Sequence, residues 1–465
     1  MARKTLHKVT ICGRSVDPLV EGGKGIGASD GISAGAWAAC GGVGTFSGTW
    51  PNFDSNSRYT IAQFNGESRD ERFIEGIDFG IRGCLHQAQI ARRMAPDGCI
   101  MMNVLWECGG VPQLLEGTLQ KAQGIIDGIV CGAGLPFNLA KICSGYKTYY
   151  NPIVSSALAF KILWNRAYVN YPEWLGSVVY EDPWLAGGHN GISSREDPNK
   201  PEKPFERILQ LRKIMNECGL SHVTIIIAGG VWNLSEWSDY IESQELAPIA
   251  FQFGTRPLYT VESPISEEWK RRLFALGPED VKLHKFSPTG YYSSSVNNNF
   301  LQELYGQIDR QVEFKDAVDE VFTEAFEFAR RTVFLRISDL EKVRAWENAG
   351  YITPMRTPDD TLIFVKPERA RQIRQDQEDC IGCLSECKFS NWDQHKGTTG
   401  ILPDPRSFCI SKTLFDIISG GSVENNLMFA GHNAYRFAQD PFYADHKMPT
   451  VAELYARIKE EYLEQ

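Results

Sequence analysis

His189 lies within Ala-Gly-Gly-His-Asn-Gly (residues 186–191), shortly after an apolar run, 178–181, that ends in an acid. The apolar run predicts a buried strand, and the glycines predict a turn whose backbone can approach a ligand closely. A histidine at such a strand end can exchange protons near neutral pH. Because glycine-glycine-histidine is a weak motif, a turn histidine satisfied by nearby carbonyl groups is an equal alternative on this stretch alone.

Four cysteines near the end of the chain have a spacing that suits a metal centre. Cys380, Cys383 and Cys387 are spaced C-x2-C-x3-C, and Cys409 follows after a loop. Three such thiols can converge on one centre, and a remote fourth completes the ligation of an iron–sulfur cluster. Zinc is the main alternative, because four thiolates also suit a tetrahedral ion. The spacing differs from the paired knuckles of zinc ribbons, which favours [4Fe-4S].

Two consecutive apolar runs end in glycine-rich turns, at Gly229-Gly230 and at Gly254-Thr255. Such turns offer backbone N–H groups to a phosphate where they lead into helices. The sequence contains neither a P-loop nor a strand-linked G-x-G-x-x-G motif, so nucleotide hydrolysis and a Rossmann domain are disfavoured. A phosphorylated cofactor beside an acid/base histidine and a metal cluster indicates FMN.

Eight short apolar runs, mostly separated by segments of helix length, must position these residues. They are 17–23, 41–46, 99–105, 128–134, 152–156, 178–181, 224–230 and 249–255. Apolar strands that alternate with helices indicate parallel pairing with both faces buried. Eight units in about 250 residues fit an α/β fold with a (β/α)8 TIM barrel better than an open doubly wound sheet. The active site of such a barrel lies at the C-terminal strand ends, where His189 and the glycine turns fall, and its last two βα loops recurrently bind phosphate.

The rest of the chain predicts two additional parts. We expect an FMN-binding barrel over residues 1–300, a helical segment over 301–375, and a cysteine-rich, iron–sulfur segment over 376–465. Residues 300–331 carry apolar side chains at helical spacing among many charges, which predicts an amphipathic helix. Residues 342–350 predict another helix, and 361–366 either a strand or an apolar connector.

Composition excludes several classes of protein. The 465 residues are 43% hydrophobic, with 48 Lys and Arg against 58 Asp and Glu, a net charge of −10. This charge argues against a nucleic-acid or anionic-membrane partner. The sequence contains no run of about eighteen apolar residues, so we expect no membrane span. The N-terminal residues also lack the long apolar stretch of a signal peptide. Twelve cysteines without such a signal suggest buried thiols and a metal site, so we expect a cytoplasmic protein.

These motifs follow one another as in the nitronate monooxygenase family, formerly called 2-nitropropane dioxygenases, which is related to the flavin-dependent enoyl-ACP reductases. The resemblance is carried by residues 18–23, 41–44, 131–136, 186–191, 228–230 and 252–255. Longer members are similar at residues 287–290, 299–301, 380–387, 408–410 and 427–436, including the cysteine motif. The middle segment is the least clearly matched. The ordered set is specific for the superfamily but does not fix its substrate.

The resemblance implies a flavin site and a role for His189 as general base or acid on the N5 side of the flavin. The residues it assigns to FMN are Gly22, Gly23, Asn103, Gly188, Gly229, Gly230, Gly254 and Thr255. Family members usually carry glutamine and methionine where this chain has Glu21 and Lys24, and often an arginine where it has 291–295. These departures concern the substrate pocket and not the flavin site.

Three functions follow from this resemblance. In the first, FMN and O2 oxidise a small nitronate-like substrate that His189 positions or deprotonates. In the second, an ene (enoyl) reductase delivers hydride to an activated double bond, and His189 or a tyrosine such as Tyr292 supplies the proton. An iron–sulfur centre suits this reaction better, because it can pass single electrons to FMN from an electron-donor protein or NAD(P)H. The third is a redox-sensing flavoprotein without turnover, which the intact glycine motifs argue against.

We therefore predict an FMN-dependent oxidoreductase of the nitronate monooxygenase type that acts on a small molecule, with the reductive enzyme as the alternative. The sequence names neither the substrate nor the electron donor, and a homo-oligomer is compatible with it.

Overall fold

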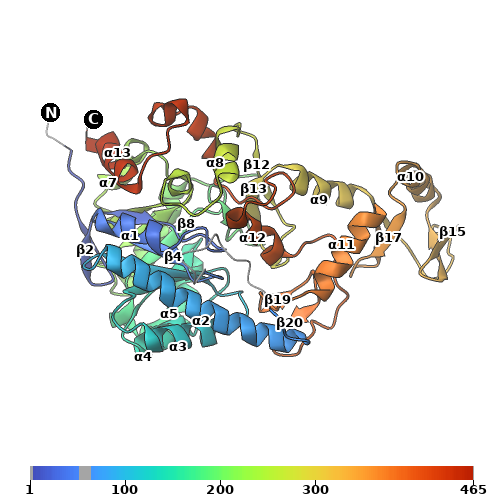
Figure 1. Cartoon of the computed structure of the whole chain (residues 1–465), viewed down its shortest axis with the longest axis horizontal. Helices are drawn as coiled ribbons and strands as arrows, with labels where there is room; N and C mark the ends of the chain where they lie inside the picture. The colour runs from blue at the N-terminus through green and yellow to red at the C-terminus, as the bar shows by residue number, and fades with distance from the viewer. Residues whose placement is uncertain (1–3, 52–63, 464–465) are drawn as a thin grey trace.

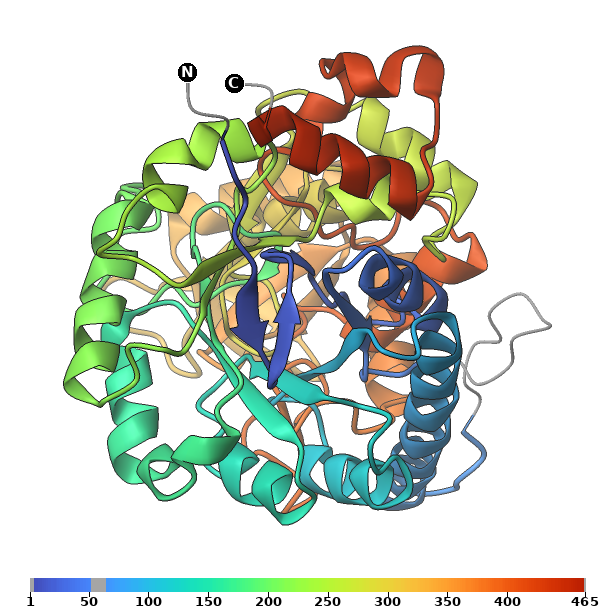
Figure 2. The same ribbon diagram turned by 90° about the vertical axis from the view of Figure 1, so that its left-hand side faces the viewer.

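The computed structural model describes residues 4–51 and 64–463. Its central element is a closed barrel of eight parallel strands (Figure 1, Figure 2). Around the barrel these are β3 (Leu19–Glu21), β4 (Val43–Ser47), β5 (Cys99–Leu105), β6 (Gly128–Gly132), β7 (Tyr149–Val154), β8 (Val178–Glu181), β10 (Ile225–Ala228) and β11 (Ile249–Phe253). Pairing of β11 with β3 closes the barrel. The predicted TIM barrel is confirmed, and each predicted apolar run overlaps one of these strands.

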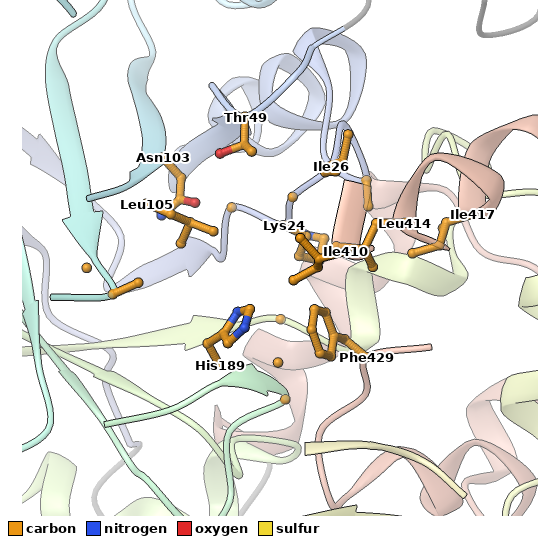
Figure 3. Close-up of a pocket in the computed structure, with 18 of the residues that line it drawn as sticks. Lys24, Ile26, Thr49, Asn103, Leu105, His189, Ile410, Leu414, Ile417 and Phe429 are labelled. Atoms are coloured by element: carbon orange, nitrogen blue, oxygen red, sulfur yellow. The ribbon is translucent and has the colours of Figure 1, made fainter. Parts of the chain in front are cut away.

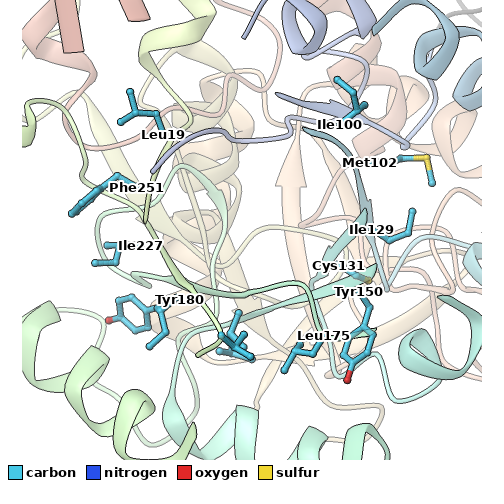
Figure 4. Packing of buried hydrophobic residues seen from close by; sticks show 14 of the residues in the cluster. Leu19, Ile100, Met102, Ile129, Cys131, Tyr150, Leu175, Tyr180, Ile227 and Phe251 are labelled. Carbon is cyan, nitrogen blue, oxygen red and sulfur yellow. The ribbon is translucent and has the colours of Figure 1, made fainter. Parts of the chain in front are cut away.

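Helices cover the outside of the barrel, between consecutive strands. They are α1 (Gly31–Ala39), α2 (Arg69–Met94), α3 (Val111–Lys121), α4 (Leu139–Gly145), α5 (Ala157–Arg166), α6 (Pro204–Glu217), α7 (Ser238–Ile241) and, after β11, α8 (Glu267–Phe274). Outward-facing strand residues such as Ile100, Ile129 and Ile227 pack against this layer (Figure 4). Both faces of the strands are thus buried, which is why their sequences are almost continuously apolar.

The interior of the barrel is filled from its N-terminal end. Val20, Val130 and Val179 belong to an interior cluster of small and branched side chains. The hairpin β1 (Val9–Ile11) and β2 (Arg14–Val16) adds Ile11 and Val16 to the same cluster and lies across the barrel in Figure 2. Since the hairpin closes this end, a ligand must enter at the opposite, C-terminal end of the strands.

The last helix of the chain, α13 (Val451–Leu463), completes the outer layer beside α1. Its Leu454 and Ile458 are buried in the same cluster as the barrel helices. Arg256, which follows the β11 turn, forms a buried ion pair with Glu461, with Nη1 and Oε2 3.0 Å apart. The end of the predicted cysteine-rich segment therefore packs on the barrel (Figure 1). Its Tyr462 also meets the start of the described chain, with Lys4 Nζ 5.0 Å from the centre of the ring.

Residues 281–378 form helices and strands, and those from residue 299 onwards extend away from the barrel (Figure 1). In order, these are β12 (Val281–His284), β13 (Ser293–Val296), α9 (Asn299–Asp309), β14 (Gln311–Glu313), β15 (Glu324–Phe328), β16 (Arg331–Leu335), α10 (Ile337–Asn348), β17 (Thr353–Arg356), β18 (Thr361–Val365) and α11 (Pro367–Glu378). The helix predicted at 342–350 overlaps α10, and the segment 361–366 is a strand.

The predicted amphipathic helix over residues 300–331 is wrong beyond Asp309. Strands β15 and β16 form an antiparallel hairpin whose turn residues, Ala329 and Arg330, both have positive φ angles. Residues 324–328 read Glu-Ala-Phe-Glu-Phe, and their exposure alternates along the strand. Side chains with this period of two suit a half-buried strand, and the abundance of charges had suggested a helix face.

Shorter elements complete the chain. They are β9 (Gly188–His189), β19 (Glu386–Cys387), β20 (Trp392–Asp393), α12 (Ile410–Ser419) and the 3-10 helices η1 (Tyr168–Asn170), η2 (Pro172–Trp174), η3 (Leu234–Trp237), η4 (Arg256–Tyr259), η5 (Ala434–Ala438) and η6 (Pro441–His446). Among the described residues, we find no helix with the length and apolar character needed to cross a membrane.

Candidate active site

A cavity of about 230 Å³ lies at the C-terminal end of the barrel strands (Figure 3). Loops after six barrel strands line one side of it, and residues from 383 to 431 line the other. The apolar side chains on this second side include Ile410, Leu414, Ile417, Met428 and Phe429. We call these five residues the roof. The barrel thus supplies a floor, and distant parts of the chain cover it.

Three polar side chains, Asn103, Glu181 and Gln252, line the cavity from the ends of β5, β8 and β11. Each lies two residues after a member of the interior cluster, namely Met101, Val179 and Ala250. Alternate residues of a strand face the same side, so the three side chains point along the barrel interior towards its open end. We call them the floor. The alternation of the strands explains why these residues meet at one place.

Gly23 lies against this floor at a distance that only glycine permits. A Cβ atom at Gly23 would be 2.3 Å from the Cβ of Asn103. Lys24 follows it, lines the cavity and places its Nζ 3.2 Å from Glu21 Oε1. Burial raises the pKa of Glu21, which also accepts a hydrogen bond from the Ser33 hydroxyl. Glu21 and Lys24 therefore form one buried ion pair beside the cavity.

His189 is held at the cavity wall by the small sheet β12-β13-β9. Its strand partner is Ser293, its Nε2 lies 2.7 Å from Ser287 Oγ, and Ser287 Oγ lies 2.8 Å from Thr289 Oγ1. The ring meets Phe429 edge-on at 5.3 Å (Figure 3). Burial lowers the pKa of His189 to about 4, so the imidazole is neutral at neutral pH. The partner of its ring nitrogen is therefore a hydroxyl group from a distant segment. The interpretation of His189 as a turn histidine had expected nearby carbonyl groups instead.

Glu181 is a cavity residue that the sequence-based assignment of the site did not include. Burial raises its pKa to about 8, and the nearby charge of Asp182 adds to this rise, so the carboxyl is protonated at neutral pH. Asp182 itself accepts hydrogen bonds at 3.0 Å from the backbone N–H groups of Trp184 and Leu185. One feature of the sequence could have identified Glu181: it is an acid at the end of an apolar strand, directly before the turn that contains His189.

The structure brings together some of the predicted flavin residues but not all. Those that line the cavity with His189 are Gly23, Asn103, Gly188, Gly254 and Thr255. Gly22, Gly229 and Gly230 do not. The Gly22 N–H donates to Phe253 O at 2.9 Å, and Gly230 O accepts a hydrogen bond from Asn433 Nδ2 at 2.7 Å. These three glycines are occupied by contacts within the protein.

One side of the cavity consists of backbone with few side chains. No heavy atom lies within 4 Å of the position that a Cβ would take on Gly254. A Cβ on Gly187 would lie 2.5 Å from the carbonyl carbon of Ala430, and the N–H of Gly431 donates to Thr255 Oγ1 at 3.3 Å. The glycines thus let two chain segments approach closely while leaving open space next to Gly254.

The four C-terminal cysteines form one group. Burial raises the pKa of the Cys383 thiol, and the charges that Cys409, Cys387 and Cys380 would carry raise it further. The charges of Cys380 and Cys409 would likewise raise the pKa of Cys387, and the charge of Cys380 would raise the pKa of Cys409. Every pair of the four is therefore within electrostatic reach. Among the residues that the structure describes, no three His, Cys, Asp or Glu side chains are placed to hold a metal ion.

This cysteine group shares a wall with the cavity. Cys383 and its neighbour Leu384 line the cavity, and Leu384 forms a β-bridge with Cys108 in the loop after β5. The N–H of Gly109 donates to Cys383 O at 3.1 Å. From α2, Arg72 Nε donates to Cys380 O, also at 3.1 Å. The barrel therefore fixes the cysteine segment at the edge of the candidate site.

Comparison with known proteins yields similarity in structure alone. No protein-family model matches the chain, and no curated protein matches it. FabK from Thermotoga maritima has 13% sequence identity and a TM-score of 0.54, over 96% of this chain and 93% of FabK. Nitroalkane oxidase from Streptomyces ansochromogenes has 12% identity and a TM-score of 0.52, over 96% of each chain. The enoyl reductase domain of MlnA from Bacillus amyloliquefaciens has 11% identity and a TM-score of 0.55, over 96% and 94%. The TM-scores show that the fold is shared over nearly the whole chain. At identities this low, the similarity shows the fold alone.

Proposed function

We propose that the protein is an FMN-dependent oxidoreductase whose active site is the cavity above the barrel. The observation that carries this proposal is that His189 and the β11 turn, Gly254-Thr255, line one cavity together with Asn103. The last βα loops of a barrel recurrently bind the phosphate of a cofactor. An oxidoreductase function is further supported by the fold shared with a nitroalkane oxidase and an enoyl reductase domain.

The residues present fit FMN. The open backbone at Gly254 and Thr255 would receive the phosphate, and Gly229 and Gly230 would serve to position this turn. The side-chain amides of Asn103 and Gln252 offer donors and acceptors to the polar edge of a flavin. When bound, FMN supplies one- and two-electron transfer. The apolar roof would exclude water from the bound flavin, and the neutral ring of His189 would face it as a hydrogen-bonding group.

We further propose that Cys380, Cys383, Cys387 and Cys409 bind one [4Fe-4S] cluster. A single zinc ion needs every thiolate at about 2.3 Å from one point, whereas each thiolate of a cluster binds a different iron. The four thiols lie in one group, and the C-x2-C-x3-C spacing of the first three differs from the paired knuckles of zinc ribbons, which favours the cluster. Ser390 and Ser411 support the group, with their Oγ atoms 3.1 Å and 3.4 Å from the sulfurs of Cys380 and Cys409.

The reaction we favour is reduction of an activated double bond. The observation behind this choice is that Cys383 lines the cavity, so that a cluster there would border the flavin and could pass on electrons from an electron-donor protein or NAD(P)H. Oxidation of a small nitronate is the second candidate. It is favoured by Lys24, a cationic residue that lines the cavity and would attract an anionic substrate.

The first test is the identity of the bound flavin and its dependence on the β11 turn. The full-length protein should release FMN, and not FAD, on heating. Gly254→Val should abolish most flavin binding, because its side chain would enter the open space at the proposed phosphate position. Gly145→Val is a matched control, since Gly145 also has no heavy atom within 4 Å of its Cβ position but lies on α4, outside the cavity. Absence of flavin after reconstitution, or equal binding by both variants, contradicts the proposal.

The second test separates the two reactions. The reduced protein should be oxidised, without O2, by an α,β-unsaturated thioester such as crotonyl-N-acetylcysteamine. Rapid aerobic consumption of propyl-2-nitronate, with no oxidation by the thioester, would favour the nitronate reaction. A bound flavin that reacts with neither would indicate a redox sensor.

A further inference from the structure

Two ionisable groups of opposite type face the same cavity from one short stretch of chain. Glu181 ends β8, and His189 follows eight positions later on β9. The turn between them is fixed by Asp182, whose carboxylate accepts the N–H groups of Trp184 and Leu185. Both side chains are therefore held in place by the fold, one by the barrel and one by the small sheet.

We propose that Glu181 is the group that gives a proton to the substrate, and that His189 binds the substrate as a neutral imidazole. This inference deepens the proposed function and rests on it. The sequence had suggested His189 or Tyr292 as the proton donor, and the inference assigns this role to Glu181. Tyr292 is not among the residues that line the cavity, and Lys285 Nζ lies 5.4 Å from the centre of its ring.

The surroundings of Glu181 keep its carboxyl uncharged. Its register partner on β10 is Ala228, which contributes only a methyl group. The other ionisable groups that line the cavity, among the described residues, are Lys24, Glu107, His189 and the thiols of Cys108 and Cys383. The pKa of Glu181 is raised by burial and by Asp182, with no cation acting against them. A carboxylic acid in such a site holds its proton at neutral pH and can release it to a basic centre nearby.

The surroundings of His189 have the opposite effect. Burial lowers its pKa to about 4, and no carboxylate contributes to offset this. At neutral pH the imidazole therefore has no extra proton to give. Its Nε2 is engaged with Ser287 Oγ, which continues to Thr289 Oγ1, and Thr289 also lines the cavity. Groups whose surroundings move their pKa values apart in this way mark the acid and its partner.

The proposed step balances as follows. When reduced FMN is bound, it would be the source of the hydride that one carbon of the activated double bond takes up. The O–H bond of the Glu181 carboxyl breaks, and its proton goes to the neighbouring carbon of the substrate. The carboxylate that remains then takes a proton from water. His189 undergoes no net change, which is consistent with an imidazole that stays neutral throughout.

The test uses the full-length, flavin-loaded protein and three variants. With crotonyl-N-acetylcysteamine, wild-type single-turnover oxidation should slow as pH rises through about 8. Glu181→Gln keeps the shape of the side chain and should lower the rate by roughly 10²–10⁴-fold, the usual range for a general acid. Asp182→Asn removes the neighbouring charge and should move the slowing to lower pH. His189→Asn should lose rate without losing this pH dependence.

A second readout does not depend on turnover. Difference infrared spectra of the wild type should show a protonated carboxyl band that disappears with a midpoint of about 8, and Glu181→Gln should lack that band. Retention of the rate and the pH dependence in Glu181→Gln, or a carboxyl that titrates near 4.5, overturns the inference. Failure of the protein to bind FMN overturns the proposed function instead, and leaves the infrared titration of Glu181 as an independent result.

Discussion

The floor and the roof of the cavity differ in origin and in chemistry. The floor residues Asn103, Glu181 and Gln252 are polar and come from barrel strands, which the hydrogen-bonding of the barrel holds rigidly. The roof residues, such as Leu414 and Phe429, are apolar and come from segments more than 150 residues beyond β11. The comparison teaches that the barrel carries the polar groups of the cavity, while the additional segments supply its apolar cover.

The largest effect that would sharpen this comparison is expected at the cysteine group. Cys383→Ser should abolish most of the bound iron and the low-temperature paramagnetic signal of the reduced protein, because one thiolate of a four-thiolate site is lost. Cys40→Ser is the matched control, since Cys40 is a partly exposed thiol at the end of α1. Iron and sulfide analysis would measure both variants. One zinc and no sulfide in the wild type would refute the cluster and remove the main argument for ene reduction.

Sequence predicted the strands that carry the floor far better than it predicted the roof. Alternation and near-continuous apolar runs are local signals, so the eight strands and the end of each strand at one rim could be read from the chain. The contact of His189 with Ser287 and the packing of the roof on the floor join residues separated by about a hundred positions or more. No local pattern specifies such contacts, because they depend on how the later segments fold back.

Two features of the site could not be predicted from the sequence, for related reasons. Gly229 and Gly230 follow a barrel strand as expected, but Asn433 and Leu185 occupy the space beside them, which only the folded chain reveals. Glu181 was missed because its direction depends on the register of β8 within the closed barrel. Once Val179 is known to point inwards, the alternation of the strand assigns Glu181 to the floor.

A smaller effect is expected when the roof alone is altered. Leu414 is 5% exposed on α12, and Leu414→Ala should lower the free energy of unfolding by about 2–5 kcal/mol, the usual cost of truncating a buried leucine. Leu402→Ala, at a leucine 46% exposed in the same part of the chain, should change it by less than about 0.5 kcal/mol. Urea unfolding monitored by fluorescence would compare the two. Equal effects would show that the roof is not a packed part of the structure.

The smallest expected effect concerns His284, which lies in the same small sheet as His189. His284 lies on β12, is 4% exposed, and has its Nε2 2.7 Å from Ser295 Oγ. Burial lowers its pKa to about 4, and the nearby His189 contributes to the lowering. Its folded pKa is below the ordinary value of 6.5, so the unfolded chain takes up a proton first as pH falls. His284 should therefore reduce stability as pH falls from 6.5 to about 4 and have no further effect below that.

His284→Gln should remove this contribution and make the melting temperature fall less steeply across the same pH range. Glu181 acts in the opposite sense, because its raised pKa makes stability decrease as pH rises from 4.5 to about 8. The comparison must therefore be between His284→Gln and the wild type at each pH, and not between pH values of one protein. His395→Gln, at an exposed histidine outside the cavity, is the control and should follow the wild type. An unchanged slope in His284→Gln would mean that the sheet holding His189 opens to water without cost, and the rigidity assigned to that side of the site would then be wrong.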